Sequence, residues 1–205
     1  MADTPNLIRA VTEADSSVGM VSAVNNLVAV KDTAAIPTLI AVFGYNNPAA
    51  AVIAVIGLTE FGEIAVPQLL EQIDDYNYGA RAYSIRTLAA IAHPDALDLL
   101  LEAAETDFAP SVRRAAAKGL GCLQWHLLDE NCRAIAQRKA LSTLLSITQD
   151  ADWAIRYAAV VGLQELAKIP SLQQEIAAKF AQMRASDAEA AVRARVVLAT
   201  QQVAS

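Results

Sequence analysis

The chain has 205 residues, of which 55% are hydrophobic but only 5% aromatic, and its formal net charge at pH 7 is −6. The acidic balance argues against a dedicated nucleic-acid-binding protein, which normally carries a basic excess. The few aromatic residues favour closely packed helices over a β-sandwich. The first ten residues lack the pattern of a signal peptide, and the longest apolar run, residues 48–58, is too short to cross a bilayer. We therefore expect a cytoplasmic protein without membrane insertion.

An aspartate stands six residues before an arginine at four places along the chain. The pairs are Asp75 with Arg81, Asp107 with Arg113, Asp150 with Arg156, and Asp187 with Arg193. Seven residues after the first three arginines come Leu88, Leu120 and Leu163, and Leu27 and Leu58 extend this series upstream. Each unit holds two apolar stretches of helical period. The pattern predicts one all-α domain over residues 1–205, a right-handed α-solenoid of about five to six helical hairpins.

The first units lack the Asp–Arg pair but keep other helix signals. Pro37 and Pro67 fall near the expected starts of second helices, where a missing N–H is harmless. The apolar run "AAAVIAVIGL" at residues 49–58 is a candidate surface for packing against a partner. We keep both features as expectations for this part of the array.

Two of the expected helices carry cations and no acid, although the whole chain is acidic. Residues 77–92 hold two arginines, and residues 110–126 hold three further cations. On a helical wheel of the second stretch, Arg114, Lys118, Gly121 and Trp125 gather opposite an apolar stripe. We expect an exposed indole there, with a glycine beside it that leaves room for something flat.

The repeat alignment places these cations at equivalent positions. Lys118 aligns with Arg86, and Arg114 aligns with Tyr157. A row of cations flanked by aromatic residues on a concave solenoid face would suit a planar anionic ligand. Two alternatives stay open: the cations are solvated or pair with the acids between residues 95 and 105, and Trp125 packs against the segment after it.

The recurring arginines have a simpler structural interpretation. Each could reach the aspartate of an adjacent turn or repeat and form a ladder along the array. The aspartate could also cap the following helix or turn by accepting backbone N–H bonds. Two irregularities complete the pattern: an insertion around residues 124–140, and a last repeat in which Thr200 replaces the leucine.

Signals of classical active-site chemistry are sparse. Cys122 and His126 stand four residues apart, so a shared helix face would allow the imidazole to activate the thiol, although cysteine there could equally be a small buried hydrophobe. His93 precedes a proline in an expected turn and suits a structural role. Cys122 and Cys132 give no disulfide framework or zinc spacing, and no metal site is expected.

The segments Tyr78–Ala82 and Ser111–Gly121 carry a resemblance to a known family. They resemble the HEAT-like phycobilisome lyases, in particular F-type subunits of the E/F-type phycocyanin α-subunit phycocyanobilin lyases. The resemblance implies a heterodimer with an E-type subunit that attaches phycocyanobilin through a thioether to a cysteine of the phycocyanin α subunit. Phycocyanobilin is then the substrate, and no cofactor is implied.

The resemblance and the wheel together give the candidate site. Tyr78 and Arg81 come from the matching motif and rank first as catalytic residues, followed by Cys122 and His126. The expected bilin-binding residues are Arg86, Arg114, Lys118, Trp125 and Tyr157.

Some relatives also isomerise the bilin, an activity associated with an Asn-His-Cys-Gln stretch. Here the corresponding segment is "ENCRA" at residues 130–134, without an adjacent histidine, which favours a plain lyase over a lyase-isomerase of the phycoerythrocyanin type. Two further alternatives stay open: a non-catalytic scaffold that docks the E-type subunit or the phycobiliprotein, and a protein that removes bilin during antenna turnover.

Overall fold

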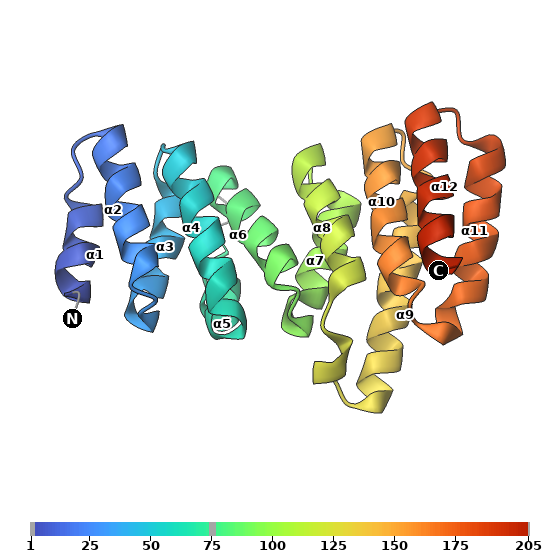
Figure 1. Ribbon diagram of the computed structural model, residues 1–205, viewed down its shortest axis with the longest axis horizontal. Coiled ribbons are helices and arrows are strands. Elements are labelled where there is room, and N and C mark those ends of the chain that lie inside the picture. The colour runs from blue at the N-terminus through green and yellow to red at the C-terminus, as the bar shows by residue number, and fades with distance from the viewer. Residues whose placement is uncertain (1–2, 74–76, 205) are drawn as a thin grey trace. The chain divides into compact units, whose positions relative to one another are not determined.

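The computed structural model describes residues 3–73 and 77–204, and every regular element in these ranges is a helix. The chain divides into two compact units, residues 1–91 and 92–205. The helical repeats confirm the predicted all-α solenoid class, and each unit is built from helical hairpins (Figure 1). The single domain over residues 1–205 stays a prediction.

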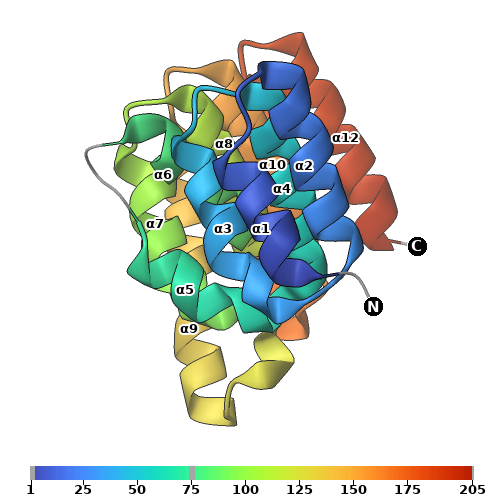
Figure 2. The same cartoon turned by 90° about the vertical axis from the view of Figure 1, so that its left-hand side faces the viewer.

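The first unit consists of three hairpins. Its α-helices are α1 (Thr4–Thr12), α2 (Ser17–Ala29), α3 (Ile36–Ala41), α4 (Pro48–Phe61), α5 (Val66–Glu71) and α6 (Tyr78–Ile91). Helices α2, α4 and α6 pack side by side as one layer, with α1, α3 and α5 behind them (Figures 1 and 2). Pro37 and Pro67 lie in the first turns of α3 and α5, so both prolines start a helix as predicted, although each helix is the first and not the second of its hairpin. Short 3₁₀ helices are Thr33–Ala35, Val42–Gly44 and Gly62–Ala65.

The segment Pro48–Glu71 is long and apolar enough, by length and composition alone, to cross a membrane. In the structure it comprises α4, a 3₁₀ turn and α5, and Gly62 breaks the path with a φ of 62°. Ala54 and Leu58 are fully buried, and α4 packs on both α2 and α6. The apolar composition of this segment is therefore explained by a repeat helix packed between two neighbours.

The second unit also consists of three hairpins. Its α-helices are α7 (Leu97–Thr106), α8 (Pro110–Cys122), α9 (Glu130–Ile147), α10 (Trp153–Leu166), α11 (Gln173–Ser186) and α12 (Ala190–Ala204). Helices α8, α10 and α12 form one layer, and α7, α9 and α11 the other (Figure 1). Three further 3₁₀ helices are Pro94–Ala96, Trp125–Leu127 and Pro170–Leu172. Residues 124–140, the expected insertion, form the 3₁₀ helix Trp125–Leu127 and the first half of α9.

The recurring leucines form the core of both units. Leu27, Leu58, Leu88, Leu120 and Leu163 are all fully buried. Burial of each such side chain contributes roughly 2 kcal/mol through removal of apolar surface from water. At the equivalent position of the last repeat the residue is an exposed threonine, and the neighbouring alanine is buried in its place.

The two central helices of the second unit, α8 and α10, approach unusually closely. A Cβ atom on Gly121 would lie 2.3 Å from the carbonyl oxygen of Gly162, and a Cβ on Gly162 would lie 2.4 Å from the carbonyl oxygen of Ala117. Only glycine allows this backbone contact. The contact fixes which side of α8 remains available to a ligand.

Candidate functional site

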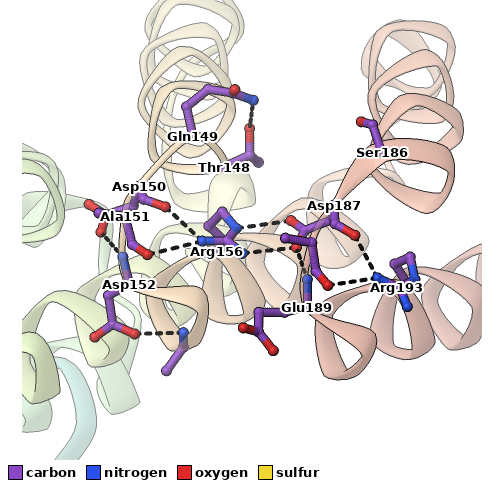
Figure 3. Close-up of polar contacts among 12 residues, drawn as sticks. Thr148, Gln149, Asp150, Ala151, Asp152, Arg156, Ser186, Asp187, Glu189 and Arg193 are labelled. Carbon is purple, nitrogen blue, oxygen red and sulfur yellow. Dashed lines mark hydrogen bonds and ion pairs between the residues drawn. The ribbon is translucent and has the colours of Figure 1, made fainter.

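Two arginines of the repeated pairs, Arg113 and Arg156, form a ladder within the second unit, and Figure 3 shows its part from Asp150 to Arg193. Nη2 of Arg113 donates to Oδ2 of Asp150 over 2.6 Å. Nε and Nη2 of Arg156 donate to the two carboxylate oxygens of Asp187, each over 2.9 Å. Each arginine thus reaches the aspartate of the following hairpin, which confirms the ladder predicted for Arg113 and Arg156.

The aspartates of the ladder also shape the turns that precede the helices. Oδ1 of Asp107, Asp150 and Asp187 accepts the backbone N–H two residues further on, over 2.8–2.9 Å. The hydrogen bonds from Arg156 lower the pKa of Asp187, and the same contact raises the pKa of Arg156. Asp75, the first member of the series, lies outside the described residues.

Two cations on α8 differ from the ladder arginines. No carboxylate of the described residues lies within ion-pair distance of Arg114, which is half-buried, or of Lys118, which is exposed. The acids of residues 95–105 have other partners: Asp98 pairs with Lys139 at 3.3 Å, and Glu105 accepts from Thr143 over 2.7 Å. The pairing alternative for Arg114 and Lys118 is therefore wrong.

The first unit presents a cation beside aromatic rings. The guanidinium of Arg86 lies 5.8 Å from the ring centroid of Tyr83, and that ring stacks on Phe43 with centroids 5.6 Å apart. Arg86 is exposed, so its outer face is open to a ligand. Arg86 belongs to the first unit, and its place in one row with Arg114 and Lys118 stays a prediction.

A second cation–aromatic pair joins α12 to α10 in the second unit. The guanidinium of Arg195 lies 5.9 Å from the ring centroid of Tyr157, and its Nη2 donates to Oε1 of Gln164 over 2.6 Å. Tyr157 was predicted as a binding residue, whereas Arg195 and Gln164 were not. Within the part of the chain that the structure describes, Arg86 in the first unit and Arg114, Lys118 and Arg195 in the second have no carboxylate partner.

Comparisons with known proteins place the chain in a family. A model described as HEAT repeats matches residues 66–125. The chain is 65% identical to the phycocyanobilin lyase subunit beta of Nostoc sp. (strain PCC 7120), over 97% of this chain and 100% of that protein. It is 50% identical to the phycocyanin alpha phycocyanobilin lyase CpcF of Synechocystis sp. (strain PCC 6803), over 79% of this chain and 76% of that protein. The chain belongs to the phycocyanobilin lyase subunit beta family.

A solved structure of the same family agrees with the fold. It is the complex of CpcE and CpcF of phycocyanin lyase from Nostoc sp. PCC 7120, which aligns with a TM-score of 0.79 and 70% identity. The alignment covers 82% of this chain and 99% of that chain. The resemblance first noticed at residues 78–82 and 111–121 is thereby confirmed.

Several details of the predicted site need correction in this family member. Helix α8 ends at Cys122, so Trp125 does not continue its face but lies in a separate 3₁₀ helix, where it is half-buried instead of exposed. Gly121 is buried against Gly162 and leaves no room for a flat ligand. The wheel was wrong here because it extended the helix by one turn and ignored the packing of α8 on α10.

The predicted Cys122–His126 pair loses its geometric basis for the same reason. His126 lies in the 3₁₀ helix beyond the end of α8, and among the described residues no hydrogen bond joins it to Cys122. Burial, and to a smaller extent the carboxylate of Glu165, raise the pKa of Cys122, which disfavours the thiolate. The catalytic roles of Cys122 and His126 stay predictions without support from this geometry.

The motif residues Tyr78 and Arg81 begin helix α6 and are half-buried. The backbone N–H of Arg81 donates to the carbonyl of Asn77 over 2.9 Å, and the side chain of Asn77 caps the helix by accepting from the N–H of Ala80 over 3.2 Å. Their catalytic roles also stay predictions. Among the described residues no group of three His, Cys, Asp or Glu side chains could hold a metal ion.

Proposed function

We propose that this chain is a subunit of a heterodimeric bilin lyase that attaches phycocyanobilin through a thioether bond to a cysteine of the phycocyanin α subunit. The observation that carries the proposal is that Arg86 and Arg195 lie beside aromatic rings without a carboxylate partner among the described residues, whereas Arg113 and Arg156 of the ladder pair with aspartates. Family membership supplies the reaction, since close relatives are named phycocyanobilin lyases.

The chemistry of the substrate fits these residues. Phycocyanobilin is a planar conjugated tetrapyrrole with two propionates. Guanidinium and ammonium groups bind carboxylates through charge-assisted hydrogen bonds, and rings such as those of Tyr83 and Tyr157 offer stacking surfaces. In the second unit, Arg114 and Lys118 would hold a propionate with a conjugated ring against Tyr157. In the first unit, Arg86 beside Tyr83 offers the same pair of contacts.

The reaction adds the cysteine S–H across the ethylidene double bond of ring A. Sulfur bonds to the ethylidene carbon, the π bond breaks, and the proton ends on ring A, so no oxidant or cofactor is consumed. Most of the acceleration would come from positioning, for which orientation of two reactants supplies roughly 7–11 kcal/mol in favourable cases. An acid would keep ring A activated, and Tyr78 with Arg81 is the first pair to test for that role.

The partner in this proposal is the E-type subunit, in agreement with the solved CpcE–CpcF complex of the family. We expect the complex to act in the cytoplasm. The alternative of a non-catalytic docking subunit has one specific observation in its favour. Val52 and Ile56, one turn apart on α4, are 51% and 54% exposed and offer an apolar surface for another protein.

A reconstitution assay tests the proposal. The chain, alone and with its E-type subunit, is mixed with phycocyanobilin and apo-α-phycocyanin, and the denatured product is assayed by absorbance and zinc fluorescence. We expect attachment of the native bilin only when both subunits are present. If the two subunits together add nothing over spontaneous attachment, the lyase function is wrong.

Variants then separate the lyase from the docking subunit. Arg86→Ala, Arg114→Ala and Lys118→Ala should each reduce product formation, whereas Arg138→Ala, which removes an exposed ion pair with Glu175, should not. A shift of the bilin absorbance on addition of this subunit alone supports binding in this chain. Absence of such a shift, with full activity of the variants, would favour the docking subunit.

A further inference from the structure

Arg195 on α12 is a buried cation without a carboxylate partner. The residue is 9% exposed, and its guanidinium lies over the ring of Tyr157. Nη2 donates to the side-chain oxygen of Gln164 over 2.6 Å, whereas Nη1 is buried and has no hydrogen-bond partner among residues 3–73 and 77–204. Among the described residues, no acid forms an ion pair with Arg195.

This state contrasts with the half-buried ladder arginines of the same unit. Arg156 has both oxygens of Asp187 and two backbone carbonyls as acceptors, and Arg113 has Asp150 and one carbonyl. A buried guanidinium with one neutral acceptor and an empty nitrogen has lost its hydration without full compensation. Arg133 shares an unpartnered buried nitrogen but has a backbone carbonyl as acceptor and no aromatic ring beside it among the described residues, so Arg195 is the better candidate for binding a flat anion.

The position of Arg195 connects it to the basic face of α8. Tyr157 and Gln164 are seven residues apart on α10, which places them two turns apart on one side of that helix. Tyr157 occupies the repeat position that Arg114 occupies on α8, and α10 packs between α8 and α12. Helix α10, which carries Tyr157, thus lies between α8, which carries Arg114 and Lys118, and α12, which carries Arg195; Figure 1 shows the order of the three helices.

We propose that Arg195 forms a carboxylate-binding site and that its ligand is one propionate of the bilin. This inference rests on the proposed lyase function. In the free chain the side-chain oxygen of the half-buried Gln164 accepts the Nη2 hydrogen bond of Arg195. The incoming carboxylate replaces that amide and accepts two N–H bonds from Arg195, while the conjugated ring that bears the propionate lies against Tyr157.

The chemistry favours a propionate on a flat molecule over other anions. The two N–H groups of a guanidinium edge match the two oxygens of a carboxylate. The adjacent Tyr157 ring favours a ligand in which a planar apolar group is attached to that carboxylate. A carboxylate side chain of the E-type subunit shares the first property but not the second. It is kept as an outcome of the test.

The test compares phycocyanobilin with its dimethyl ester, which retains the tetrapyrrole but lacks both carboxylates. Binding to the chain is followed by bilin absorbance for the unchanged protein, Arg195→Met, Gln164→Glu and the control Arg138→Met. Gln164→Glu is nearly isosteric and provides Arg195 with an internal carboxylate. It should fold at least as stably as the unchanged protein, because it pairs the buried cation.

We expect Arg195→Met and Gln164→Glu each to weaken binding of the free acid by about tenfold, the size of one charge-assisted hydrogen-bonded contact. Binding of the dimethyl ester should be unchanged by both, and Arg138→Met should change neither ligand. If Arg195→Met fails to fold, the binding of the free acid and of the dimethyl ester to Gln164→Glu decides whether the propionate site exists.

Equal loss for acid and ester, or no loss for either, would overturn the propionate site. Unchanged bilin binding with a weakened complex with the E-type subunit would assign Arg195 to a partner carboxylate and would also overturn it. The reconstitution assay separates these results from failure of the function itself. If the unchanged heterodimer forms the product, the proposed lyase function stands even when the Arg195 site is wrong.

Discussion

Arg113 and Arg114 are neighbours in the sequence of α8, yet they have opposite environments. Arg113 is tied to Asp150 at 2.6 Å and to the carbonyl of Ala104 at 3.0 Å, whereas Arg114 has no carboxylate partner among the described residues. Arg113 has an equivalent arginine in every repeat that carries the Asp–Arg pair. The position of Arg114 is occupied by Tyr157 in the next hairpin. In the second unit the recurring arginines hold hairpins together, whereas Arg114, whose position differs between repeats, has no carboxylate partner among the described residues, as its proposed binding role requires.

The strongest test of this contrast removes a ladder arginine. Arg156→Ala should lower the free energy of unfolding by about 3–5 kcal/mol, because it leaves Asp187 buried without its counter-charge. Urea denaturation followed by circular dichroism measures the change. Arg114→Ala is the matched control on the neighbouring helix. A similar loss for Arg114→Ala would abolish the distinction between the two classes.

The close contact of α8 with α10 provides the next test. Gly121→Ala should destabilise the protein by roughly 1–3 kcal/mol, because the new Cβ would meet the backbone of Gly162 at 2.3 Å. Gly79→Ala is the control, since its Cβ has only a side-chain oxygen at 3.6 Å and helix propensity improves. Unchanged stability of Gly121→Ala would restore Gly121 to the ligand face.

The pH dependence of stability tests the contact between Arg156 and Asp187 in a second way. The folded-state pKa of Asp187 is lowered by its hydrogen bonds from Arg156. Its contribution to stability is therefore full above the unfolded value, about 3.9, and is lost as pH falls through the lowered folded pKa. Stability of the unchanged protein should fall more steeply below about pH 4 than that of Arg156→Ala. If the stability of both proteins falls equally steeply with decreasing pH, Asp187 does not gain its stabilising effect from Arg156.

The smallest effect on stability is expected on the ligand face. Lys118→Ala should change the free energy of unfolding by less than about 0.5 kcal/mol, because the side chain is exposed and has no ion pair to lose. Bilin binding should nevertheless weaken several-fold, and the difference should shrink at high salt as charges are screened. Affinity that is insensitive to both the substitution and salt would remove Lys118 from the site.

The sequence was sufficient for the fold because the repeat is encoded redundantly. The six-residue Asp–Arg spacing, the leucine series and the prolines at helix starts all pointed to stacked hairpins, and the ladder followed from the same spacing. The sequence did not reveal where α8 ends or that Gly121 is buried. A helical wheel contains no information on where the helix stops, and the Gly121–Gly162 contact depends on a residue 41 positions away.

Two residues of the proposed site, Tyr83 and Arg195, are absent from the sequence-based prediction although the sequence contains signals for both. Tyr83 and Arg86 are three residues apart on one helix, a spacing at which side chains meet. Arg195 occupies a repeat position that holds Ala115 and Ala158 in the two preceding hairpins, so a charged residue there already breaks the pattern. Its missing acceptor, in contrast, becomes visible only in three dimensions.

Arg193 repeats half of the pattern seen at Arg156. Its Nη1 donates to the carbonyls of Asp187 and Ala188, as Nη1 of Arg156 does to those of Asp150 and Ala151. Among the described residues, the nitrogens that at Arg156 grip the following aspartate have no acceptor at Arg193. The ladder thus acts as a directional connector, with a donor edge at one end. A grafted hairpin whose turn supplies an aspartate would find its attachment point already formed, which makes the length of the array an adjustable property in protein engineering.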